Sequence, residues 1–115
     1  MNEIDMTIEC FQIDRQDNVA TLLQDAPESA EVVVRGDASR TSLKAMQPIR
    51  AGHKVALRPI EPGEHVIKYG LAIGEATQEI REGEWVHLHN CRSLYDAQSS
   101  SLDIESGARK ETPYV

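Results

Sequence analysis

Two histidines separated by one residue are the strongest candidates for chemistry in this chain. They lie in the segment HLHNCR, residues 87–92. Alternation along a β-strand would place His87 and His89 on one face, together with Cys91 if the strand continues. Two neutral imidazoles can share one divalent cation, although they fill only part of its coordination sphere. The alternative is a pair of half-exposed strand histidines beside a turn-forming asparagine, with Arg92 as a surface charge.

A second group of reactive side chains lies upstream, in GHK at residues 52–54 and in IKYG at residues 67–70. Histidine and lysine can both transfer protons. A lysine holds a carboxylate as a point charge, and burial lowers the pKa of its ammonium group until it can act as a base. The alternative reading of Lys54 and Lys68 is that of surface lysines, whose stems pack along a strand while their charges stay in water.

A repeated pattern, Ile-x-x-Gly-x-x-Val, indicates how the chain positions these residues. Glycine adopts a positive φ at little cost, so each copy can end one strand at Ile, turn at Gly and start the next strand toward Val. The spacing between copies is too uneven for a solenoid and instead predicts a compact sheet of bent strands. The copies are Ile49/Gly52/Val55, Ile60/Gly63/Val66 and Ile80/Gly83/Val86.

The first half of the chain predicts a strand, a helix and a hairpin. Loose alternation from Thr7 to Ile13 is typical of a strand. Residues 17–26 predict a short helix, because Asp17 or Asn18 can cap it and apolar residues then recur at helical spacing. The β-branched run 30–35, the Gly-Asp turn signal after it and the run 41–46 predict a hairpin. The fold class is therefore mostly β, with one short helix near the N-terminus.

Composition excludes several classes of protein. With 19 acidic and 12 basic residues the net charge is -7, which argues against a nucleic-acid binder. No apolar stretch has the length of a membrane span, and the acidic N-terminus does not resemble a secretory signal. Two distant cysteines in such a chain are typically reduced, which favours a cytoplasmic location. The Ser-rich, aperiodic segment 98–115 predicts a disordered tail after a single domain at residues 1–97.

Several segments together resemble the amino-terminal SAF-type domain of the altronate and galactarate dehydratase family, which also includes the two-subunit sulfolactate sulfo-lyase. The resemblance runs in order from Thr7 to Tyr95, and the combination of its segments is specific. They are DNVA at 17–20, GHKVAL at 52–57, VIKYG at 66–70, IG at 73–74 and GEWVHLHNCR at 83–92.

This resemblance implies a β-clip fold and an elimination reaction β to a carboxylate. Removal of the α-proton accumulates charge on the carboxylate, so such a site needs a cation and an acid for the leaving group. The implied metal is iron or another first-row or alkaline-earth divalent ion, shared with a partner chain. The matching positions give catalytic candidates (His53, Lys54, Lys68), substrate-binding candidates (Asn90, Arg92) and metal ligands (His87, His89).

The family's dehydratases continue into a much larger catalytic domain that this sequence does not contain. The expected function is therefore that of a small subunit or separate SAF domain, contributing part of a sugar-acid hydro-lyase site to a large dehydratase-type partner. The chain by itself is not expected to be active, and a homo-oligomer is compatible with the sequence. Two alternatives remain open, namely a sugar-acid-binding module without catalysis and an assembly domain whose acidic surface docks other proteins.

Overall fold

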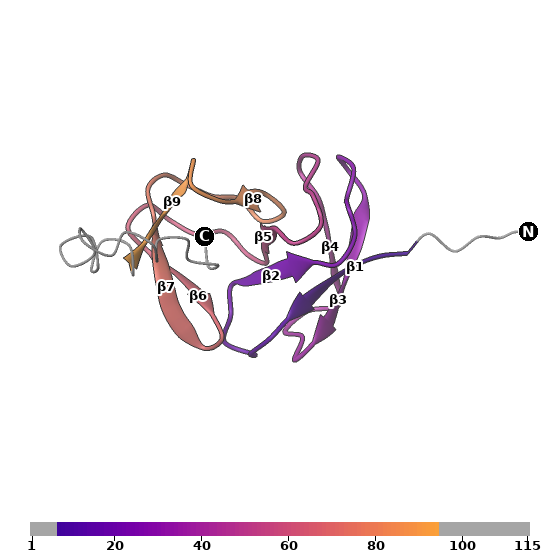
Figure 1. The fold of residues 1–115 in the computed structure, drawn as a ribbon, viewed down its shortest axis with the longest axis horizontal. Coiled ribbons are helices and arrows are strands. Elements are labelled where there is room, and N and C mark those ends of the chain that lie inside the picture. The colour runs from indigo at the N-terminus through magenta and orange to yellow at the C-terminus, as the bar shows by residue number, and fades with distance from the viewer. Residues whose placement is uncertain (1–6, 95–115) are drawn as a thin grey trace, which may run out of the picture.

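The computed structural model describes residues 7–94, which form nine strands in two sheets (Figure 1). The larger sheet has the order β4-β3-β1-β2-β5-β8, and the smaller has the order β6-β7-β9. Strands β1 and β3 pair in parallel, and the other pairings are antiparallel. The strands are β1 Ile8–Gln12, β2 Val19–Leu22, β3 Glu31–Gly36, β4 Ser42–Lys44, β5 Lys54–Ala56, β6 His65–Lys68, β7 Leu71–Ala76, β8 Trp85–Val86 and β9 Cys91–Ser93.

Two apolar cores hold the sheets together, and β2 and β5 separate them. Along β2, Ala20 and Leu22 pack into the first core, whereas Val19 packs into the second. Along β5, Val55 faces the first core and Ala56 the second. Both strands are therefore buried on both faces, as expected of the central strands of a layered β-domain.

The helix predicted at residues 17–26 is wrong, because Val19–Leu22 forms β2. A strand buried on both faces carries a continuous apolar run, and such a run also satisfies helical spacing. The expected capping residues have another task, since the side chains of Asp17 and Asn18 bond to a distant hairpin. Within the described residues, no helix has the length and apolar character needed to cross a lipid bilayer.

The predicted opening strand and hairpin are confirmed as β1 and the antiparallel pair β3–β4. The three glycine turns are also confirmed, with φ values of 89°, 86° and 86° at Gly52, Gly63 and Gly83. Each turn closes with a backbone hydrogen bond from the residue after the glycine to the residue two before it. The predicted tail at residues 98–115 lies outside the described residues.

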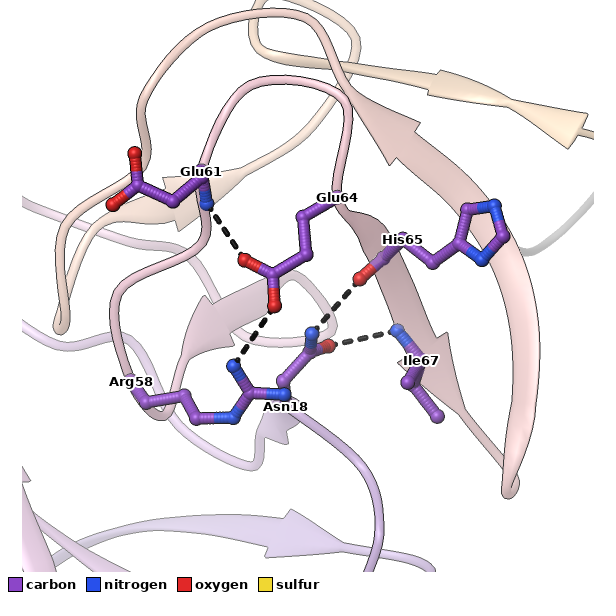
Figure 2. A network of polar contacts seen from close by, with 6 residues as sticks. All are labelled: Asn18, Arg58, Glu61, Glu64, His65 and Ile67. Carbon is purple, nitrogen blue, oxygen red and sulfur yellow. Dashed lines mark hydrogen bonds and ion pairs between the residues drawn. The ribbon is translucent and has the colours of Figure 1, made fainter.

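Two buried polar side chains connect the sheets. The Asn18 amide donates from Nδ2 to the His65 carbonyl (2.9 Å) and accepts at Oδ1 from the Ile67 amide (2.7 Å), as Figure 2 shows. Asp17 accepts from the backbone amides of Tyr69 (3.1 Å) and Gly70 (2.8 Å). The β6–β7 hairpin is thereby fixed against the start of β2.

Gly63 and Gly83 allow the glycine turns to be tested as a matched pair. Both have a φ of 86°, but a Cβ at Gly63 meets no atom within 4 Å, whereas one at Gly83 would overlap the Lys44 carbonyl oxygen. We expect Gly63→Ala to lower the free energy of unfolding by about 1–2 kcal/mol through backbone strain alone. Gly83→Ala should cost clearly more in urea unfolding. Equal losses would show that the close approach to Lys44 contributes nothing.

Candidate functional site

The indole of Trp85 is the centre of an imidazole cluster at the junction of β5 and β8. The ring centroids of His53 and His87 lie 5.1 Å apart. His53 lies edge-on to Trp85 at 5.5 Å, His87 stacks on it at 5.3 Å, and His89 is tilted against it at 4.7 Å. The structure therefore brings together all three histidines that the sequence singled out.

A hydrogen bond fixes the orientation of the His53 ring. The Trp85 indole Nε1 donates to His53 Nδ1 over 3.1 Å. Because an indole N–H can only donate, Nδ1 must be the unprotonated nitrogen, and the proton of a neutral ring then lies on Nε2. His53 is thus arranged to offer an Nε2–H donor.

His53 follows the glycine of the first turn, and in the other two turns the side chain at this position stabilises the turn itself. After Gly63 and Gly83 the chain has Glu64 and Glu84, whose carboxylates accept the backbone amides of Glu61 (2.8 Å) and Arg81 (2.6 Å) respectively. The first turn has no such glutamate.

That first turn is held from outside instead. The Asp25 carboxylate accepts the Ala51 amide over 2.8 Å. The side chain after Gly52 is therefore released from bracing its own turn, and His53 uses this freedom to contact Trp85.

The two downstream histidines lie in a turn, which corrects the prediction of a strand through them. Strand β8 ends at Val86, and residues 87–90 close with a bond from the Asn90 amide to the His87 carbonyl. The Asn90 side chain ends the strand, since it accepts from the His87 amide (3.0 Å) and donates to the Trp85 carbonyl (2.9 Å). Both imidazoles reach Trp85 through this turn rather than through strand alternation.

The two lysines are buried, so the interpretation as surface lysines is wrong. Lys54 is 5% exposed and Lys68 is 8% exposed. Burial lowers the pKa of Lys54 to about 8, helped by the positive charge of Lys68, while Cys91 acts in the opposite direction. Burial also raises the pKa of the Cys91 thiol. Lys54 is consequently a lysine that can release its proton near neutral pH.

The pKa of His87 is lowered, first by partial burial and then by the positive charges of Lys54, His53 and His89. This favours the neutral ring, which is the form that binds metals. Among the described residues, no three His, Cys, Asp or Glu side chains are grouped so that they could hold a metal ion. The donor set within residues 7–94 therefore fits a metal only in part.

The two remaining candidates have partners within the chain. The amide group of Asn90 bonds to the backbone around the 87–90 turn, as described above. The Arg92 guanidinium pairs with Glu75 over 2.9 Å, and its side chain is 62% exposed. Their roles in substrate binding stay predictions.

Sequence reasoning did not single out Trp85 or Arg50. Trp85 carried a signal, because it is the only tryptophan of a chain in which aromatic residues make up 4%. Arg50 carried no such signal, because Arg81 occupies the equivalent position in the third glycine turn and the sequence does not distinguish the two arginines. Arg50 lines a cleft of about 280 Å³ together with Pro48, His53 and Trp85.

Fold and site thus define a small all-β domain of bent strands, which gathers imidazoles and buried lysines where β5 and β8 meet. The chain belongs to the altronate/galactarate dehydratase SAF domain family, which it matches over residues 8–94.

Three curated relatives illustrate the family. The altronate dehydratases of Bacillus subtilis and Escherichia coli are 36% and 45% identical to this chain over 89 and 83 residues. These matches cover 76% and 72% of this chain but only 17% and 16% of the relatives. The (2R)-sulfolactate sulfo-lyase subunit alpha of Chromohalobacter salexigens is 34% identical over 91 residues, covering 76% of this chain and 97% of that subunit.

The lowered pKa of Lys54 predicts a particular pH dependence of stability. Between pH 8 and pH 10.5 the unfolded chain keeps the Lys54 proton and the folded chain releases it, so the free energy of unfolding rises with pH across this window. The contribution is up to about 1.4 kcal/mol per pH unit. Lys54→Met should abolish this component in denaturant unfolding measured from pH 7 to pH 10. The exposed Lys44→Met is the control, and an unchanged pH profile in Lys54→Met would refute the assignment.

The Trp85–His53 hydrogen bond predicts one tautomer for His53. In ¹H–¹⁵N spectra of the isolated chain, the neutral His53 ring should carry its proton on Nε2. Trp85→Phe keeps an aromatic ring but removes the donor, so His53 should then become a mixture of tautomers. The exposed His65 serves as an internal reference. A protonated Nδ1 in the neutral wild-type ring would contradict the geometry.

Proposed function

We propose that this chain is the small SAF component of a lyase that eliminates a group β to a carboxylate, working in complex with a larger catalytic chain. The observation that carries the proposal is the imidazole cluster around Trp85. The buried Lys54 lies close enough to act electrostatically on His87, Lys68 acts in turn on Lys54, and the described residues hold no complete set of metal ligands. The small relative named as a subunit is matched over 97% of its length, which supports a separate small chain with a partner.

The names of the relatives support a substrate class, because they include altronate and galactarate dehydratases. We therefore assign a sugar acid as substrate and water as the group eliminated. In this reaction the α C–H bond and the β C–O bond break, a C=C bond forms, and the hydroxyl leaves as water after protonation.

We also assign the bent-hairpin arrangement to the β-clip class and place the protein in the cytoplasm.

Lys54 is the residue best suited to take the α-proton. With a pKa of about 8, a useful fraction of its amine is neutral at neutral pH. Burial keeps that pKa low, and the neighbouring positive charge of Lys68 lowers it further and attracts a carboxylate. His53 offers its Nε2–H as a hydrogen-bond donor to a substrate oxygen.

His87 and His89 are the residues of this chain that would hold a divalent metal, with the remaining ligands from the partner. Such an ion stabilises negative charge on a substrate carboxylate when bound. The His87 ring stacks on Trp85 and the His89 ring packs against it at a tilt, and the lowered pKa favours the neutral form of His87.

Reconstitution with the large chain tests this function. We expect no turnover of altronate or galactarate by the small chain alone, and turnover when a large dehydratase-type partner chain is added. His87→Ala/His89→Ala should lower the turnover of the complex at least tenfold, as expected when a group worth about 1.4 kcal/mol in the transition state is lost.

The same double variant should melt within a few degrees of the wild type, because His89 is exposed and His87 is only half-buried. His65→Ala, which replaces an exposed histidine away from Trp85, is the matched control. Full activity of the double variant in the complex would remove both histidines from the site. Robust turnover by the small chain alone would refute the need for a partner.

A further inference from the structure

The cleft beside Trp85 is lined by four residues, of which the sequence analysis singled out only His53. Pro48, Arg50, His53 and Trp85 enclose about 280 Å³. This volume is just below the range of about 300–1,000 Å³ that is typical of small-molecule sites. The size favours a small metabolite over a large cofactor.

Arg50 supplies a positive charge at this cleft. Arg35, Arg58 and Arg92 each pair with a glutamate within 3.3 Å, but no acidic partner of Arg50 is found among the described residues. A guanidinium presents a planar set of donors that matches the two oxygens of a carboxylate. In a chain of net charge -7, an arginine that pairs with no acid among residues 7–94 and lines a cleft is suited to an anion from outside.

The other walls complement a hydroxylated carbon chain. The ring of Pro48 and the indole of Trp85 give apolar surfaces for C–H groups. His53 offers its Nε2–H, because Nδ1 already accepts from Trp85. The cleft thus combines a carboxylate-binding cation, a hydrogen-bond donor and two apolar walls.

We propose that this cleft is the subsite that holds the carboxylate end of a polyhydroxy acid, with Arg50 binding the carboxylate and His53 donating to a hydroxyl. The choice of acid rests on the proposed function. The subsite itself is formed by this chain alone, so it can be tested without a partner or turnover.

The only tryptophan of the sequence lies in the cleft and serves as the probe. We would titrate the isolated full chain with galactarate, with the neutral polyol galactitol and with adipate, which has the same carbon chain and both carboxylates but no hydroxyls. Trp85 fluorescence should respond to galactarate, respond at least tenfold more weakly to adipate, and not respond to galactitol. Calorimetric titration provides a readout that does not depend on the indole.

Arg50 and Arg81 form a matched pair of variants, because each begins its glycine turn and Arg81 does not line the cleft. Arg50→Gln should weaken galactarate binding at least tenfold, whereas Arg81→Gln should leave it unchanged. Arg50→Lys, which keeps the charge without the planar fork, should fall between the wild type and Arg50→Gln.

Several results would overturn the subsite. They are an absence of galactarate binding by both methods, equal binding of galactitol, or equal loss in both glutamine variants. Equal affinity for adipate would also overturn it, since the cleft would then recognise a carboxylate alone, such as an acidic side chain of another protein. Intact binding in a chain that fails to support turnover in the complex would refute the proposed function and leave the subsite standing.

Discussion

The structure depends on the hydrogen bonds that the adjacent side chains Asp17 and Asn18 make to the β6–β7 hairpin. They satisfy backbone groups at His65, Ile67 and the turn that follows, which would otherwise be partly buried without partners. Leaving such groups unpaired costs about 1–3 kcal/mol each. These bonds fix the position of the smaller sheet against the larger one, and the second apolar core fills the space between them.

The candidate site is a product of that junction. Lys54 lies on the same face of β5 as Ala56, which packs into the second core, and Lys68 ends β6. Without the packing of β5 against the β6–β7 hairpin, the ammonium group of each lysine would lie in water. Docking the hairpin places the two amines in one poorly solvated region. Burial there lowers the pKa of Lys54, and the positive charge of Lys68 lowers it further.

Local signals in the sequence predicted the turns and much of the strand pattern. A glycine that adopts a positive φ determines a turn within a few residues, and a run of β-branched residues favours a strand over a similar distance. The three glycine turns and the β3–β4 hairpin could therefore be predicted from short segments of sequence. The error at residues 17–26 has a nonlocal cause, since β2 is buried by segments far away in sequence. Periodicity cannot distinguish a strand covered on both faces from a helix.

Site geometry was harder to predict for the same reason. The sequence indicated His87 and His89, but it placed them on a strand that in fact ends at Val86. Their convergence with His53 requires the β5–β8 pairing and one indole between them. The burial of Lys54 and Lys68 likewise follows from the packing of two sheets, which no short motif encodes.

The three glycine turns show how a repeated element can take on a new task without loss of the scaffold. In two of the turns a glutamate, Glu64 or Glu84, accepts a backbone amide of its own turn, so each of these turns is held by its own residues. In the first copy Asp25 supplies the brace from another segment, so the position after Gly52 is free to vary. In this turn the hydrogen bond that holds the loop and the side chain that the loop presents are therefore supplied by different segments. A histidine in place of Glu64 or Glu84 would need an external hydrogen bond of the same kind to hold its turn.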